Sequence, residues 1–245
     1  MRSLAFAARN RKEILRDPLN LVFGIGFPLV ILLLLTAIQA NVPTEIFNIN
    51  KLIPGIAVFG LSFISLFSGM LIAKDRSTSF LMRLFTAPLS ASDYIIGYIV
   101  PLVPMAIVQT IISFIAALFL GLPFNANVLL AILVLLPISL LFIGIGLLAG
   151  SIFNDKQVGG ICGALLTNVS AWLSGTWFDL NLVGGWFKEI AYALPFVHAV
   201  DASRAALSGD YASILPHLWW VIGYTVVIIV IAIFVFKKKM NGENA

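Results

Sequence analysis

Charged residues in this chain fall into short clusters, and the uncharged stretches between the clusters have the length of a lipid bilayer. A helix needs about 20 apolar residues to cross the hydrocarbon core, and a charge at the bilayer centre costs about 2.5–3.5 kcal/mol on insertion scales. The uncharged stretches are residues 18–44, 52–73, 94–154, 157–178 and 211–236. Four of them fit one crossing each, and the third fits two because a break at residues 121–127 divides it. The pattern therefore predicts six transmembrane helices.

The predicted crossings use most of the chain and leave little of it for a soluble domain. Charged residues make up 11% of the 245 residues, against about 25% in ordinary soluble domains. We therefore expect an all-α membrane protein in which residues 1–245 form a single transmembrane domain. The expected spans lie at residues 19–40, 52–73, 94–120, 128–153, 158–178 and 218–236.

The basic residues are divided unequally between the two sides of the membrane that these spans define. Of the 15 Lys and Arg residues, 12 lie on the side of both termini, and only Lys51, Lys188 and Arg204 lie on the other. Lys and Arg accumulate in cytoplasmic loops, so we expect both termini to be cytoplasmic. This asymmetry also explains the basic composition, and it predicts contact with membrane lipid rather than with nucleic acid.

The segment before the first span is typical of an amphipathic helix at the membrane surface. Charged residues share one helical face, and apolar residues lie largely opposite. The charged set is Arg9, Lys12, Glu13 and Arg16, and the apolar set is Leu4, Ala7, Ala8 and Leu15. The same residues also serve as a topological anchor, and the two readings are compatible.

The longest internal segment on the cytoplasmic side, residues 74–93, contains a short apolar stripe that ends before Pro88. Ser90 and Asp93 then have the spacing of a capping box that opens the third span. An apolar helix on this side must dock on the bilayer, on the protein's own helix ends or on a cytosolic protein. The stripe consists of Phe80, Leu81, Leu84 and Phe85.

The segment between the fifth and sixth spans, residues 179–216, is too apolar for a solvated domain. We expect short helices at or partly within the outer leaflet, one of them at residues 199–207. On that helix Asp201 and Arg204 are i, i+3 neighbours and can pair.

Small residues at two places have the spacing that lets membrane helices approach closely. Gly146 and Gly150 close the fourth span, and Gly159 and Gly163 open the fifth. We expect them to pack this helical hairpin.

The spans contain no Asp, Glu, Lys, Arg or His, which argues against an ion-coupled transporter and against a charged-ring channel. The chain also has no G-x-x-x-x-G-K-[ST] phosphate loop, so it does not bind ATP by that route. An intramembrane serine protease would need a serine facing a histidine. The candidates are Ser68 and Ser174 with His198 or His217, and no G-x-S-x-G motif supports them.

Three stretches of the chain resemble the permease subunit of ABC-2 type exporters. Residues 173–178 (LSGTWF) are similar to that family's motif at the outer end of the fifth span, and residues 194–204 (LPFVHAVDASR) to its following stretch. Residues 83–90 (RLFTAPLS) are similar to its cytoplasmic segment. A basic surface helix followed by six spans is also the plan of that family.

The resemblance implies the membrane subunit of an ATP-driven exporter, in the bacterial plasma (inner) membrane, with no catalytic, cofactor or metal site of its own. A separate cytosolic ABC ATPase would bind ATP and Mg, and a second permease chain, identical or homologous, would complete the path. The implied ATPase-coupling residues are Phe80, Leu81, Arg83, Leu84 and Phe85. The implied outer-gate residues are Ser174, Gly175, Phe178, Pro195, Asp201 and Arg204.

The charge-free interior favours an amphiphilic cargo, such as a drug-like or lipid-like compound. Two alternatives stay open at this point. One is a permease that exports a lipid-linked polysaccharide, and the other is an ATP-independent membrane channel or scaffold.

Overall fold

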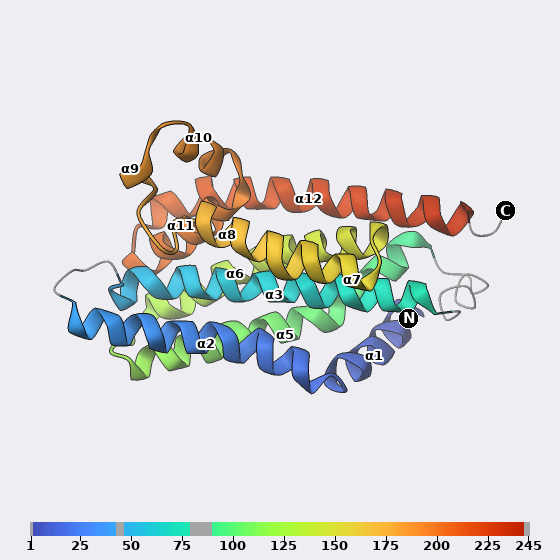
Figure 1. Cartoon of the computed structure of the whole chain (residues 1–245), viewed down its shortest axis with the longest axis horizontal. Helices are drawn as coiled ribbons and strands as arrows, with labels where there is room; N and C mark the ends of the chain where they lie inside the picture. The colour runs from blue at the N-terminus through green and yellow to red at the C-terminus, as the bar shows by residue number, and fades with distance from the viewer. Residues whose placement is uncertain (1, 43–46, 79–89, 243–245) are drawn as a thin grey trace.

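The computed structural model describes residues 2–42, 47–78 and 90–242. This part of the chain is helical and contains no strand, as an all-α membrane protein requires. Five long helices lie side by side along the length of the molecule (Figure 1). They are α2 (Pro18–Asn41), α3 (Ile49–Ser77), α5 (Ala91–Phe119), α6 (Ala126–Ile152) and α12 (Tyr211–Gly242). All five are long and apolar enough to cross a membrane.

The fifth predicted span is one uninterrupted helical run over residues 155–173 whose hydrogen bonding changes twice, and the described residues contain five candidate spans among the long α-helices. The run consists of α7 (Asp155–Val158), the π-helix η1 (Gly159–Leu166) and α8 (Thr167–Leu173). A π-helix is wider than an α-helix and usually lasts a single turn. The predicted span also extends too far, because the helix ends at Leu173 and Gly175 has a φ of +68°.

The N-terminal helix α1 (Arg2–Leu15) lies across the start of α5. Phe6 inserts between Tyr94 and Tyr98, with ring centroids 5.7 and 4.9 Å apart in edge-to-face geometry. Leu4 is 60% exposed. Of the predicted apolar face only Ala7 is buried, whereas Leu4, Ala8 and Leu15 are exposed; the core takes Phe6, which was not in the predicted set.

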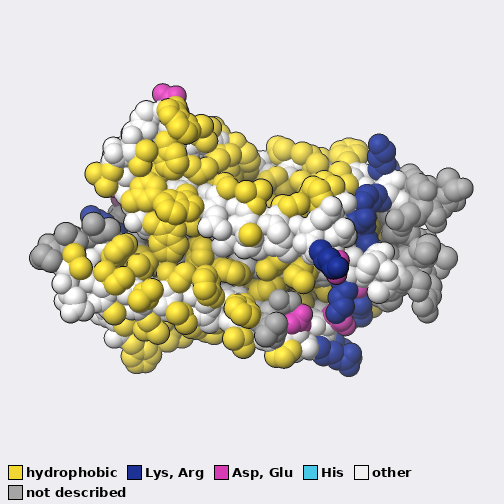
Figure 2. All heavy atoms as spheres, viewed as in Figure 1, with side chains coloured by type: hydrophobic (Ala, Val, Ile, Leu, Met, Phe, Trp, Pro, Cys, Tyr) yellow, Lys and Arg dark blue, Asp and Glu magenta, His cyan; other side chains and the backbone are white. Residues whose placement is uncertain are grey.

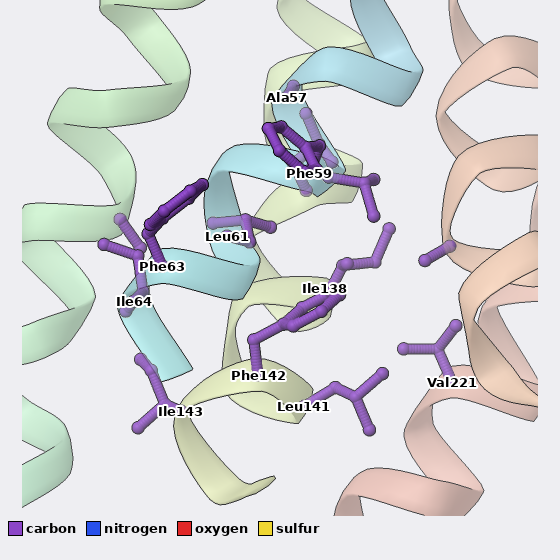
Figure 3. Close-up of a cluster of buried hydrophobic side chains, with 14 of the residues drawn as sticks. Ala57, Phe59, Leu61, Phe63, Ile64, Ile138, Leu141, Phe142, Ile143 and Val221 are labelled. Atoms are coloured by element: carbon purple, nitrogen blue, oxygen red, sulfur yellow. The ribbon is translucent and has the colours of Figure 1, made fainter. Parts of the chain in front are cut away.

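Helix α3 is the central element of the bundle. Within its most apolar window 89% of the residues are buried, against 17% in α2 and in α12. Its side chains pack with those of α6 and α12 in a continuous apolar core (Figure 3). Helix α3 is buried in this way because α2, α5 and α6 all pack against it, whereas α2 and α12 are largely exposed to the surroundings.

Glycines allow α3 and α6 to approach until their backbones touch. A Cβ atom on Gly146 would collide with Ser68 Oγ and the Ser65 carbonyl, and one on Gly150 would collide with the carbonyl of Gly69. The close partner of Gly146 and Gly150 is thus α3, and the expected packing within the α6–α8 hairpin is wrong. Gly163 also faces α3, through Leu66.

The two ends of the bundle differ in charge. Lys and Arg side chains gather at the end that carries both termini, which we call the basic end (Figures 1 and 2). The opposite end carries α9 (Leu180–Val183), α10 (Gly185–Ala193) and α11 (Pro195–Ser208). Helices α9 and α10 stand off the side of the bundle (Figure 1), whereas α11 is mostly buried between α6 and α12.

Candidate functional site

The predicted coupling residues Phe80, Leu81, Arg83, Leu84 and Phe85 lie outside the described residues. Both flanks of this segment are described. Helix α3 ends at Ser77, and the predicted capping box opens α5: the Asp93 amide donates to Ser90 Oγ at 3.3 Å, and the Ser90 amide donates to Asp93 Oδ2 at 3.0 Å.

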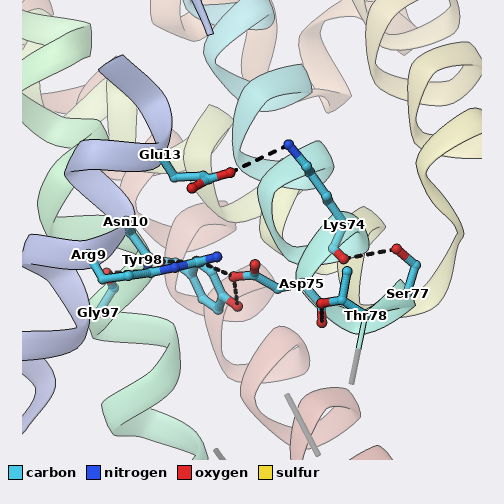
Figure 4. A network of polar contacts seen from close by, with 9 residues as sticks. All are labelled: Arg9, Asn10, Glu13, Lys74, Asp75, Ser77, Thr78, Gly97 and Tyr98. Carbon is cyan, nitrogen blue, oxygen red and sulfur yellow. Dashed lines mark hydrogen bonds and ion pairs between the residues drawn. The ribbon is translucent and has the colours of Figure 1, made fainter. Parts of the chain in front are cut away.

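A buried carboxylate fixes the end of α3. Asp75 is 3% exposed, and its Oδ2 accepts from Arg9 Nη1 at 2.6 Å and from the Tyr98 hydroxyl at 2.9 Å. Burying a carboxylate is costly unless it is paired and hydrogen-bonded, and these partners come from α1 and α5. The network therefore ties three helices together beside the predicted coupling segment (Figure 4).

Two further contacts hold α1 in this position. Asn10, fully buried, donates from Nδ2 to the Gly97 carbonyl of α5 at 3.1 Å. Gly97 is needed there, because a Cβ atom on it would collide with the ring of Phe6. At the surface Glu13 and Lys74 form a looser ion pair at 3.5 Å.

A cavity of about 300 Å³ opens beside this network. Its lining combines apolar and charged side chains. The apolar ones include Phe67, Met70, Leu71 and Met105, and the charged ones are Glu13, Asp17, Lys74 and Asp155. This combination suits an amphiphilic molecule.

At the opposite end Arg204 of α11 joins three segments. Its Nη2 donates to the Gly175 carbonyl at 2.7 Å, and its Nε donates to the Lys51 carbonyl at 3.2 Å. Its Nη1 lies 3.5 Å from Asp201 Oδ1, so the predicted i, i+3 pair is present. The guanidinium fork, with donors in fixed directions, thus connects α11 to the start of α3 and to the turn after α8. We call this set of contacts the Arg204 clamp.

Burial disfavours the charged forms of both members of this pair. It raises the pKa of Asp201 and lowers the pKa of Arg204, and in each case the partner's charge opposes the shift. The two side chains stabilise each other's charge in partly desolvated surroundings. Loss of one would leave the other charge under-compensated.

The remaining predicted gate residues surround this clamp. Ser174 Oγ lies 2.6 Å from Thr176 Oγ1 within the turn that presents the Gly175 carbonyl. The ring of Phe178 lies 5.8 Å from that of Trp172 and 6.2 Å from that of Phe187. Pro195 is the first residue of α11, a position that suits its missing N–H.

The histidines pair with each other, which argues against the protease alternative. His198 Nδ1 lies 2.8 Å from His217 Nδ1, and His198 Nε2 lies 2.9 Å from the Tyr192 carbonyl oxygen. In the hydrogen bonds of the described residues, neither Ser68 nor Ser174 reaches a histidine. No group of three or more His, Cys, Asp or Glu side chains in that part of the chain could hold a metal ion.

The sequence analysis did not identify Asp75 or the histidine pair as sites. The position of Asp75 in the sequence could have indicated its role, because it is an acidic residue between two basic ones, Lys74 and Arg76, directly after a long apolar span. The histidine pair joins residues 19 positions apart on two helices, and no local pattern predicts such a contact.

The bundle of long apolar helices with polar clamps at its two ends places the protein among the multi-pass membrane proteins. Residues 3–208 match the model of a family described as ABC-2 type transporter. The chain belongs to this family, as its motifs indicated. It is therefore a membrane transport permease and is not itself catalytic.

Two relatives support this assignment. The ycf38 protein of Porphyra purpurea, whose name describes it as a transport permease, is 30% identical over 204 residues, covering 78% of this chain and 69% of the relative. The ycf38 protein of Pyropia yezoensis carries the same name and is 29% identical over 202 residues, with the same coverage.

Proposed function

We propose that the protein is the membrane subunit of an ATP-driven exporter and that a separate cytosolic ABC ATPase docks on residues 77–86. The observation that carries the proposal is the Arg9–Asp75–Tyr98 network. Helix α3 runs through the centre of the bundle and leads directly to the proposed docking segment. A rigid attachment at that point would pass a displacement of the ATPase into the core rather than lose it in a loose loop.

The cargo of this exporter is an amphiphilic compound, drug-like or lipid-like, that enters from the basic end. The cavity beside α1 supports this, because its lining combines charged side chains with apolar side chains of α3 and α5. The spans offer no ionisable group that would bind a hydrophilic ion inside the bundle.

The proposed arrangement in the membrane follows from the same features. The composite helix α7–η1–α8 crosses the membrane as the fifth of six spans, and the basic end with both termini faces the cytoplasm. A second permease chain completes the path, and the bacterial plasma membrane is the proposed location. The Arg204 clamp would then hold the outer gate, since it joins three segments at the extracytoplasmic end.

Co-purification tests the central proposal. The tagged chain should bring down an ABC ATPase, and reconstituted complexes should hydrolyse ATP faster when an amphiphilic cargo is added. Leu84→Asp should abolish ATPase recovery while insertion stays normal. A well-inserted chain that co-purifies with no ATPase, or whose Leu84→Asp variant keeps full recovery, would contradict the proposal and favour an ATP-independent channel or scaffold.

A further inference from the structure

The contact between His198 of α11 and His217 of α12 has only one arrangement of hydrogens when His198 is neutral. The Tyr192 carbonyl oxygen, 2.9 Å from His198 Nε2, can only accept, so Nε2 carries the hydrogen. A neutral imidazole then has a lone pair on Nδ1. His217 Nδ1, 2.8 Å away, must therefore be the donor.

The first and the second proton have opposite consequences for the pair. The first can sit on Nε2 of His217, and one hydrogen then still bridges the two Nδ1 atoms. The second can enter only at Nδ1 of His198, the atom that accepts this hydrogen bond. With both rings charged, two N–H groups would face each other at a distance that suits a hydrogen bond, and the contact would become repulsive.

We propose that His198 and His217 form a proton-sensitive joint between α11 and α12, which opens when both rings are charged and the second proton reaches His198 from the α9–α11 side of the membrane. The His198 ring is held in a defined place for this role. It stacks on Trp220 with centroids 5.1 Å apart and planes at 2°, and it meets the Tyr192 ring edge-on at 5.8 Å.

The charged groups around His198 act in both directions. Burial is the largest influence and lowers the pKa of His198, and His217 acts in the same sense. The Tyr192 carbonyl and Asp201 oppose the shift, and Asp201 is itself paired with Arg204. The ring is therefore neutral at neutral pH, and acid is needed to open the joint.

Opening would act on the clamp formed by Arg204, which lies on the same helix as His198. Beside the joint, the Tyr224 hydroxyl donates to the Ala193 carbonyl at 2.6 Å and gives a second attachment between α12 and the end of α10. Loss of the histidine contact would leave only this hydrogen bond to hold the corner between α10 and α11 against α12, so opening of the joint would move the corner, with α10, away from α12.

Nitrogen-15 NMR of the full chain in phospholipid nanodiscs tests the hydrogen assignment, because the chain has only two histidines. At neutral pH His198 should show a protonated Nε2 and a bare Nδ1, and His217 should show a protonated Nδ1. On acidification the His198 Nδ1 signal should change to the protonated form. A bare His198 Nε2 at neutral pH would overturn the assignment.

Opening itself is measured as the distance between spin labels at Glu189 and Val226, both exposed, in a Cys162→Ala background. The population with a longer distance should rise from about 10% to about 90% over about two pH units, as a one-proton equilibrium requires. His198→Asn keeps an acceptor for His217 but cannot take the proton, so its distance should not change.

An unchanged distance in the native sequence under acid, or an equal widening in His198→Asn, would overturn the proposal. Neither measurement uses transport or ATP hydrolysis. Both results are therefore independent of the proposed exporter function.

Discussion

Arg9 and Asp75 are 66 positions apart in the sequence, yet Arg9 Nη1 lies 2.6 Å from Asp75 Oδ2. The contact joins the N-terminal helix to the last turn of the central helix. Since Tyr98 of α5 binds the same oxygen, the three helices should move as one unit at the basic end.

Removal of Arg9 should destabilise this end of the bundle. In Arg9→Ala the buried carboxylate of Asp75 loses its ionic partner, and we expect the free energy of unfolding to fall by about 1–3 kcal/mol. Unfolding in a denaturing detergent titration measures this. Lys74→Ala is the matched control, because Lys74 is next to Asp75 on α3 and also pairs with a residue of α1. Its exposed pair with Glu13 at 3.5 Å should contribute at most about 1 kcal/mol. Equal losses in the two variants would contradict the assigned role of Asp75.

The glycine contact between α3 and α6 should not tolerate a methyl group. In Gly150→Ala the new Cβ atom would collide with the Gly69 carbonyl, and we expect a loss of about 1–3 kcal/mol, as in other overpacked cores. Gly223→Ala on α12 is the control, since a Cβ atom there meets nothing within 4 Å. It should be neutral or stabilise α12 by up to about 1 kcal/mol through helix propensity. The same detergent titration distinguishes the two outcomes.

The clamp at the opposite end depends on the guanidinium group and not only on its charge. Arg204→Lys retains the charge but cannot reproduce donation to both the Gly175 and the Lys51 carbonyls. We expect Arg204→Lys and Arg204→Ala to insert and to bind the ATPase but to lose most export.

The contribution of the ion pair itself needs a separate comparison. Asp201→Ala and the double variant with Arg204→Ala should show coupling, with the double variant less impaired than the sum of its parts. Normal export in Arg204→Ala, Asp201→Ala and their combination would remove the clamp from the gating mechanism.

Stability should decrease in mild acid because of His198. Its pKa in the folded protein is lowered by burial below the ordinary value of 6.5, so the unfolded chain binds more protons just below that pH. The free energy of unfolding should be constant above about pH 6.5 and should fall as the pH drops below it. Asp201 has the opposite effect on the free energy of unfolding, because its pKa is raised in the folded protein. Its contribution changes over a pH range that begins at the ordinary value of 3.8 and extends upward. His198→Asn should flatten the profile between about pH 5 and 8, and an unchanged profile would assign the effect to another group.

The apolar stripe of residues 80–85 predicts how a new charge affects coupling. Leu84→Asp places a carboxylate on the stripe, whereas Ser79→Asp places one on the other side of a helix with the same register. Cargo-stimulated ATP hydrolysis should fall at least about tenfold in the first variant, which corresponds to about 1.4 kcal/mol in the activation free energy, and change little in the second. Equal effects would mean that the stripe does not face the ATPase.

Much of the fold is predictable from the sequence because the bilayer imposes a length on every charge-free stretch. Five of the expected spans appear as long helices, and the capping box at Ser90 and the Asp201–Arg204 pair are present as expected. The fifth span contains a π-helical segment at Gly159–Leu166 that the sequence did not predict, because hydrophobicity does not distinguish an α-helix from a π-helix.

The tertiary contacts were less predictable, because they depend on which helices become neighbours. The spacing of Gly146 and Gly150 indicated a close contact but not that its partner is α3. The burial of Asp75 requires α1 to fold back across α5, and the histidine pair requires α11 to lie antiparallel to α12. A local pattern contains neither relationship.

The partners of Arg204 on α3 and after α8 are main-chain oxygens, at Lys51 and Gly175. Every amino acid supplies such an oxygen, so the identity of the side chain at position 51 has no bearing on that bond. The three positions of the clamp should therefore differ in the substitutions they tolerate. Position 51 should accept many residues, position 175 is limited by its positive φ, and position 204 must remain arginine. A survey of natural variants would find the clamp preserved by one invariant residue rather than by matched substitutions at its partners.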